Sequence, residues 1–241
     1  MPRIRLDLQY DGTDYSGWQR QENASSVQAE IERHLSQLCG EPIEIVGCGR
    51  TDTGVHAHRY TAHADLPDAH PEDLAYRLNK MLPEAIAIQT AAPCHPNFHA
   101  RFDCKERHYE YRIHRQKSPF LARYSWHYPF DLDLESMNQA ASLLLGQRSF
   151  ASFCKGEIPN QNAVCDLRTA QWHETEQGLI FEIKADRFLR NMVRAIVGTL
   201  MEVGQAKIAA SSMPSLLAAE RRSEAGNSVP ARGLSLSGLL Y

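Results

Sequence analysis

A short glycine-rich segment carries an isolated carboxylate. Residues 49–54, Gly-Arg-Thr-Asp-Thr-Gly, place Asp52 between two glycines. The glycine spacing is that of a phosphate-binding loop, but Val55 and His56 stand where such a loop needs Lys and Ser or Thr, which excludes a nucleoside triphosphate site. Flanking glycines let a substrate approach the backbone closely, so Asp52 could act as a nucleophile or base. The alternative is an Asx-turn in which Asp52 only stabilises the loop.

A basic stripe is predicted on a later helix. Residues 188–203 have the apolar pattern of a helix, and Arg187, Arg190 and Arg194 have the i, i+3, i+7 spacing of one helical face. Apolar residues surround Arg194, so its guanidinium is expected near the core, where it needs a carboxylate partner; Asp52 is the candidate. The alternative is that Arg194 extends past its apolar neighbours to solvent.

Two tyrosines are predicted on one face of a strand. Tyr109 and Tyr111 lie two residues apart, as do Arg107 and Tyr109, so all three side chains point the same way. Tyrosines in such positions usually pack in the core. They could instead stack beneath a nucleic-acid base.

The histidines do not form a recognisable metal-binding pattern. His56 and His58 repeat at strand spacing, and His95 and His99 follow Cys94. A structural metal site needs a tetrahedral ligand set with characteristic spacing, which these residues do not supply, so we expect no metal. A metal-dependent hydrolase using His56, His58 and a nearby carboxylate is the alternative.

The charge is unevenly distributed along a globular chain. Its 241 residues are 43% hydrophobic with a net charge of −3, so the protein can form a core and is not uniformly basic. However, residues 101–123 hold seven basic side chains against three acidic ones, and residues 184–194 hold four against one. Such local excess is typical of a polyanion-binding groove. Either segment alone could also be a solvated strand face.

The compartment is predicted to be the cytoplasm. The first residues, MPRIRLDLQYDG, alternate like a strand and lack the apolar core of a signal peptide. Arg190 and Arg194 interrupt the most apolar stretch before it reaches the roughly 20 residues that span a bilayer, so no membrane insertion is expected. The six cysteines lie far apart without a Cys-x-x-Cys pair, so neither disulfides nor a zinc knuckle are indicated.

The elements that position these residues occur in two similar series. The first is strand, helix, strand, strand, helix, strand, with strands at 4–10, 43–48, 55–66 and 85–91. Its first helix is expected to open with a capping box of Ser25 and Gln28, and its second with Pro71. The second series has strands at 107–115, 165–174, 178–185 and 233–241. Its helices are expected at 134–146, stopped by Gly146, at 188–203, and after Pro214.

This order predicts an α+β fold. Two β-α-β-β-α-β series suggest two ferredoxin-like halves, most economically joined through a largely antiparallel central sheet. No low-complexity linker divides the chain, so we expect one continuous scaffold with two lobes, residues 1–103 and 104–241. The first lobe carries the Asp52 loop, and the second carries the Tyr109 strand and the Arg194 helix.

Five segments together resemble the tRNA pseudouridine synthase A family. They are GRTDTGVHA (49–57), FHARF (98–102), RHYEYRI (107–113), FLRNMVRAIVG (188–198) and GLSLSGLLY (233–241). The resemblance implies the pseudouridine synthase fold and a cofactor-free isomerase, an intramolecular transferase that detaches uracil from its ribose, rotates it and rejoins it through carbon. It implies action on uridines 38, 39 and 40 in the anticodon stem-loop of tRNA, by a homodimer.

The resemblance also assigns roles to individual residues. It implies that Asp52 is the nucleophile, that Tyr109 stacks on the uracil and moves a proton, and that Arg194 pairs with Asp52. Arg50 resembles the residue that takes the space of the flipped base, and His56 and Arg101 are further expected RNA contacts. The requirement for flipping has an independent basis, because a stacked uridine hides its glycosidic carbon and its C6.

A rival of another class is a non-catalytic RNA-binding module on ferredoxin-like sheets. Tyr109 and Tyr111 would then serve as stacking platforms. Such a module needs aromatic and basic residues, but it needs neither Asp52 nor a buried Arg194.

Overall fold

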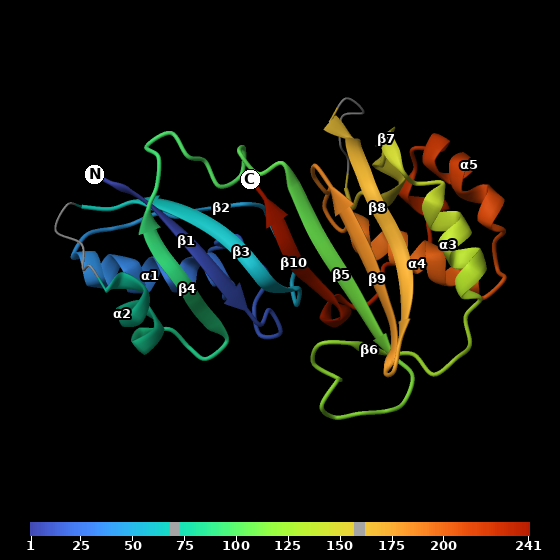
Figure 1. Cartoon of the computed structure of the whole chain (residues 1–241), viewed down its shortest axis with the longest axis horizontal. Coiled ribbons are helices and arrows are strands. Elements are labelled where there is room, and N and C mark those ends of the chain that lie inside the picture. The colour runs from blue at the N-terminus through green and yellow to red at the C-terminus, as the bar shows by residue number, and fades with distance from the viewer. Residues whose placement is uncertain (68–72, 157–161) are drawn as a thin grey trace. The chain divides into compact units, whose positions relative to one another are not determined.

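The computed structural model describes residues 1–67, 73–156 and 162–241, which divide into two compact units (Figure 1). Unit 1 contains Met1–Lys105 and Leu236–Tyr241, and unit 2 contains Glu106–Ser235. Both units combine helices with mainly antiparallel strands, so the predicted α+β class is confirmed. Among the described residues, no helix is long and apolar enough to cross a membrane.

Unit 1 has the predicted β-α-β-β-α-β order. Its strands are hydrogen-bonded in the order β4-β1-β3-β10, and β2 also pairs with β3. Alternate residues of β1, from Ile4 to Tyr10, are buried and pack in a core to which α1 contributes Val27, Ile31 and Leu35. The elements are β1 (Arg3–Tyr10), α1 (Val27–Cys39), β2 (Val46–Gly47), β3 (His56–Asp65), α2 (Leu74–Met81) and β4 (Ile86–Pro93), with β10 (Leu234–Leu240) returning at the end of the chain.

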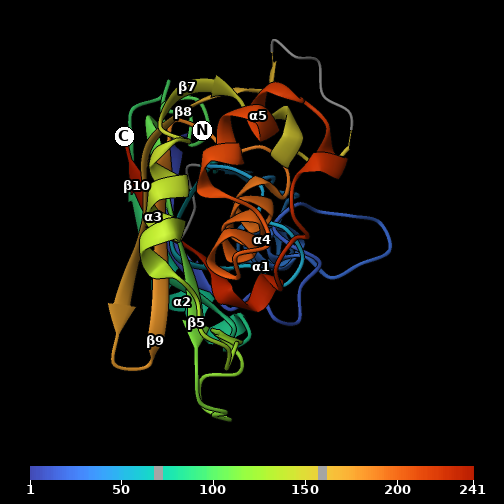
Figure 2. The ribbon, with the colours of Figure 1, turned by 90° about the vertical axis from the view of Figure 1, so that its right-hand side faces the viewer.

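Unit 2 contains the second series, with additional short elements, except for its last strand, β10, most of which belongs to unit 1. Its strands run in the order β5-β9-β8-β7, and β6 pairs in parallel with β5. Figure 2 shows α4 and α5 on one side of β5 and β9. The elements are β5 (Glu106–His114), β6 (Trp126–His127), α3 (Leu134–Ser142), β7 (Gly146–Ser149), β8 (Val164–Thr175), β9 (Gly178–Ala185), α4 (Met192–Gly204) and α5 (Met213–Ala218), with short 3₁₀ helices at Ala151–Phe153, Ala210–Ser212, Arg222–Glu224 and Ala231–Gly233.

The first helix is capped one residue later than predicted. Ser26, not Ser25, is the N-cap of α1, and its hydroxyl accepts a hydrogen bond from the Ala29 N–H. The capping box fails because the Gln28 amide does not turn back to the cap; it donates to the Ile45 carbonyl and accepts from the Arg20 N–H. Residue Pro71, the predicted opening of the next helix, lies outside the described residues.

Two helix boundaries in unit 2 also differ from the prediction. Helix α3 ends at Ser142 rather than at Gly146, because the next backbone N–H groups bond to carbonyls three residues back and tighten the chain into a turn. Helix α4 begins at Met192 rather than at residue 188. Asn191 precedes it with φ 64°, a left-handed conformation that a continuous helix cannot contain. The predicted helix at Pro214 is confirmed as α5.

Candidate functional site in the Asp52 loop and on β5 and α4

Asp52 lies on a tight turn that leads directly into β3. The Asp52 carbonyl accepts a hydrogen bond from the Val55 N–H at 3.1 Å, and Gly54 has φ 76°. Strand β3 then starts at His56, one residue after the predicted start, so the loop is followed by the predicted strand and lacks the helix that follows a phosphate-binding loop. Within the turn Thr51 is buried, Asp52 is half-buried and Thr53 is exposed. The Asp52 carboxylate is therefore partly exposed on a turn whose backbone is hydrogen-bonded.

A second loop, residues 11–18, packs directly against the Asp52 turn. The Trp18 N–H donates to the Thr51 carbonyl at 3.3 Å, and the Gly54 N–H donates to the Tyr15 carbonyl at 3.2 Å. Gly17 has φ 95°, and a Cβ on it would lie 2.4 Å from the Thr51 carbonyl oxygen. Only glycine permits this approach.

Gly12 also lies close to the turn, at the Val55 backbone. A Cβ added to Gly12 would lie 2.0 Å from the Val55 carbonyl oxygen. Gly12 and Gly17 are therefore positioning residues for Asp52, and neither was predicted from the sequence. The two glycines in the stretch Asp11–Trp18 indicate a loop, but their spacing does not indicate which part of the chain the loop contacts.

Aromatic side chains on neighbouring elements contact the residues around the Asp52 turn. The Tyr10 hydroxyl lies 2.8 Å from Thr51 Oγ1, and both groups are buried. The Tyr60 hydroxyl donates to the Gly49 carbonyl, and its ring stacks on Trp18 with centroids 4.0 Å apart. The backbone on both sides of Arg50 is thus fixed, while the Arg50 side chain itself is exposed.

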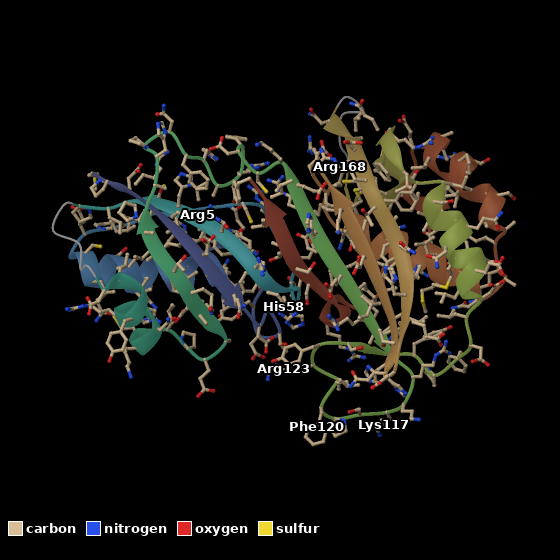
Figure 3. The ribbon with its side chains drawn as sticks, in the orientation of Figure 1. Arg5, His58, Lys117, Phe120, Arg123 and Arg168 are labelled. Carbon is tan, nitrogen blue, oxygen red and sulfur yellow. The ribbon has the colours of Figure 1, made fainter. Side chains whose placement is uncertain are left out.

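His56 is part of this support. Its side chain is buried, and its Nδ1 accepts a hydrogen bond from the Gly12 N–H at 3.1 Å. In contrast, His58 is exposed (Figure 3). Nowhere in the described ranges do three His, Cys, Asp or Glu side chains form a group that could hold a metal ion.

Tyr109 is half-buried on β5 in unit 2. Its ring meets Phe188 edge-on, with centroids 5.2 Å apart and planes at 90°, an arrangement that fixes the tyrosine ring. This contact of Phe188 was not predicted, because residue 188 was expected to begin a helix.

Tyr111, the second predicted stacking residue, is fully buried, and its hydroxyl donates to the Pro230 carbonyl. Burial raises the pKa of Tyr111, against the opposing effect of Arg194 and Arg232. Tyr111 is therefore a core residue and not a stacking platform.

Arg194 lies in the first turn of α4 and is half-buried. Its Nε donates to the Val229 carbonyl at 2.8 Å, while the Val229 N–H donates to the Arg194 carbonyl at 3.2 Å. The segment around Asn227 and Val229 can come this close to α4 because Gly198 has no side chain. A Cβ at Gly198 would lie 1.7 Å from the Asn227 carbonyl oxygen. This reciprocal pair of hydrogen bonds holds the guanidinium on the surface of α4.

The predicted arginine stripe is wrong. Arg187 and Arg190 are exposed and precede α4, so they do not share a helical face with Arg194. The left-handed Asn191 separates them from the helix. Arg190 instead contributes its carbonyl, which accepts a hydrogen bond from the Lys155 N–H.

The predicted site residues are divided between the two units. Arg50, Asp52, His56 and Arg101 belong to unit 1, and Tyr109 and Arg194 belong to unit 2. Arg101 is exposed, and its guanidinium lies 5.7 Å from the centroid of the Phe102 ring. The cysteines, all within the described ranges, are thiols rather than disulfides.

Comparison with known proteins identifies the family. The sequence model of a family described as tRNA pseudouridine synthase matches residues 8–103 and 140–241. The tRNA pseudouridine synthase A of Porphyromonas gingivalis is 44% identical over 246 aligned residues, covering all of this chain and 98% of the relative. Those of Parabacteroides distasonis and Acetivibrio thermocellus are 41% and 39% identical, covering all of this chain and 96% and 100% of the relatives. The chain therefore belongs to the tRNA pseudouridine synthase family.

Proposed function

We propose that this protein isomerises uridine to pseudouridine in tRNA, at positions 38, 39 and 40 of the anticodon stem-loop. Family membership supports the class of reaction. The observation that carries the proposal is the Asp52 turn, whose backbone is held by the Trp18 N–H, the Tyr15 carbonyl and the close approach of Gly17. A carboxylate fixed in this way is suited to attack a substrate that must itself be held in one orientation.

The reaction needs one nucleophile and the transfer of protons. The Asp52 carboxylate attacks the flipped nucleotide at either ribose C1′ or uracil C6. The bond from C1′ to N1 breaks, the uracil rotates, a bond from C1′ to C5 forms, and the bond between Asp52 and the substrate breaks, which releases the carboxylate. The proton on C5 is lost and N1 gains one, so substrate and product have the same composition and no cofactor is consumed. Tyr109, with its ring held by Phe188, stacks on the uracil and takes part in the proton transfer.

The remaining predicted residues have supporting roles in the proposal. Arg194 pairs with the Asp52 carboxylate and holds it in position for attack. Arg50, exposed next to the nucleophile, fills the space left by the flipped base, and Arg101 contacts the RNA backbone. His56 is buried, so we assign it an indirect contribution to RNA binding, through the Gly12 N–H that it holds.

The organisation and location of the enzyme are part of the same proposal. The lobes 1–103 and 104–241 act as the two functional halves, the first supplying the nucleophile and the second the tyrosine and arginine. The enzyme works as a homodimer in the cytoplasm. Six thiols without a disulfide are compatible with a reducing compartment.

Mapping of pseudouridine in tRNA tests the proposed function. Total tRNA is compared between cells with and without the gene for this protein, and the gene is restored on a plasmid as a control. Loss of pseudouridine at positions 38–40, with recovery on restoration, supports the proposal. Unchanged modification at these positions contradicts it.

A further inference from the structure

The segment that follows β5 is basic from residue 115 to residue 130. From Arg115 to Phe130 the sequence contains no Asp or Glu and three basic residues, Arg115, Lys117 and Arg123, of which Arg115 pairs with Asp131 at 3.3 Å. This stretch overlaps the end of the basic segment 101–123. Its charge complements a polyanion.

The same loop exposes large aromatic side chains. Phe120 is 90% exposed, Phe130 is 66% exposed and Tyr124 is 46% exposed. Lys117 and Phe120 lie at the outer turn of the loop, beyond the end of β5 (Figure 3). Exposed aromatic rings interleaved with basic residues form the usual surface for unpaired nucleotides, because bases stack on the rings and phosphates pair with the cations.

The base of the loop is rigidly attached to unit 2. The Tyr128 N–H donates to the His114 carbonyl at 2.9 Å, and the Tyr128 hydroxyl accepts from the Gln205 amide at 2.6 Å. At the outer turn, the Ala122 N–H donates to the Ser118 carbonyl at 3.2 Å. A loop held at both ends loses little conformational entropy when it binds, which favours its use as a recognition element.

The loop also lies at a distance from the proposed uridine-binding tyrosine. His114, where the loop begins, is five residues beyond Tyr109 on the same strand, a separation of about 17 Å at the rise of an antiparallel strand. This is several nucleotides away along an RNA strand. A contact made by the loop would therefore involve a part of the tRNA other than the flipped uridine.

We propose that residues 115–130, the β5–α3 loop, form a second tRNA-contacting element, in which Phe120 stacks on an unpaired base and Lys117 binds phosphate. This inference rests on the proposed function, because it takes tRNA as the occupant. The positive charge favours RNA over a second copy of this chain, since two such loops facing each other would repel.

Two variants and two matched controls test the proposal. Phe120→Ser removes the ring, and Tyr76→Ser removes another exposed aromatic ring, 63% exposed on α2. Lys117→Gln removes one cation of the loop, and Lys207→Gln removes an exposed lysine elsewhere in unit 2. The dissociation constant for unmodified tRNA is measured for each variant between about 50 and 200 mM salt.

The proposal predicts losses in affinity confined to the loop variants. Phe120→Ser weakens tRNA binding by about fivefold or more, as expected for one lost stacked base. Lys117→Gln lowers the slope of log affinity against log salt by about one phosphate contact. Both effects appear in the dissociation constant rather than in the maximal single-turnover rate, and both controls bind tRNA like the wild type.

Three outcomes would overturn the proposal. The first is unchanged affinity in both loop variants, and the second is an equal loss in the controls. The third is a change of sedimenting mass caused by Phe120→Ser, because the loop would then be an interface between copies of this chain. Failure of the proposed function is distinguishable: wild-type protein would bind tRNA without forming pseudouridine, and the affinity comparison would still decide the role of the loop.

Discussion

Gly17→Ala should displace the Asp52 turn and slow the reaction without removing a reactive group. The new Cβ would lie 2.4 Å from the Thr51 carbonyl oxygen, whereas ordinary contact begins at 3.4 Å, so the two loops must separate by about 1 Å. A misplacement of this size at a catalytic group costs about 100-fold in rate, equivalent to about 2.7 kcal/mol in activation free energy.

The backbone conformation adds a separate cost to stability. Gly17 has φ 95°, where an L-residue is disfavoured by about 1–2 kcal/mol. Gly40, the C-cap of α1, has φ 74° but nothing within 4 Å of an added Cβ. Gly40→Ala therefore carries the conformational cost without the collision, and it serves as the matched control.

The assay compares single-turnover rates of pseudouridine formation with tRNA saturating. Circular dichroism and thermal unfolding of both variants confirm that they are folded at the assay temperature. We expect Gly17→Ala to be about 100-fold slower than wild type, and Gly40→Ala to have a wild-type rate. A folded Gly17→Ala protein with a rate within about threefold of wild type would refute the positioning argument.

Three further outcomes are expected. Arg194→Met should lower the single-turnover rate with saturating tRNA by about tenfold or more, because the nucleophilic carboxylate loses the cation proposed to pair with it, whereas Arg190→Met, which removes an exposed arginine, should leave that rate unchanged; equal rates for both variants would contradict the pairing with Asp52. His63 is buried, its Nδ1 accepts the Ala100 N–H, and burial, with help from Arg3 and His99, lowers its pKa to about 4. As the pH falls below about 6.5, this histidine therefore takes up a proton in the unfolded chain before it does so in the folded one, which destabilises the fold. Between pH 7 and pH 4 the unfolding free energy of the wild type should fall by about 3 kcal/mol more than that of His63→Asn. An equal fall for both proteins, measured by urea unfolding at each pH, would contradict this. Activity should survive prolonged chelation once magnesium for the tRNA is restored, and recovery that requires zinc would revive the histidine metal site.

Periodicity was enough to predict most of the elements. Strand β1 alternates buried and more exposed residues along its length, and α1 carries apolar residues at helical spacing, so both were predicted from the sequence. The exact cap was not predictable, because Ser25 and Ser26 are adjacent and only the extended backbone of Ser26 decides between them. The start of α4 was missed because the left-handed Asn191 leaves no trace in hydrophobic periodicity.

The candidate site was predicted only in part for a related reason. The type and spacing of residues 49–54 identify Asp52 as a reactive candidate. However, Gly12 and Gly17 contact the turn from more than thirty residues away in sequence, and local pattern carries no information about such contacts. Tyr111 was a plausible stacking residue because it shares a strand face with Tyr109, but its burial depends on the chain around Pro230, which approaches from the end of the sequence.

The most direct test of the central claim is the single-turnover rate of Asp52→Asn with saturating tRNA. Asparagine keeps the size and polarity of the side chain but removes the nucleophilic carboxylate. We predict that pseudouridine formation falls below detection while the dissociation constant for tRNA stays within about tenfold of wild type, or about 1.4 kcal/mol. Pseudouridine formation by folded Asp52→Asn at a rate comparable to wild type would contradict the assignment of Asp52 as the nucleophile.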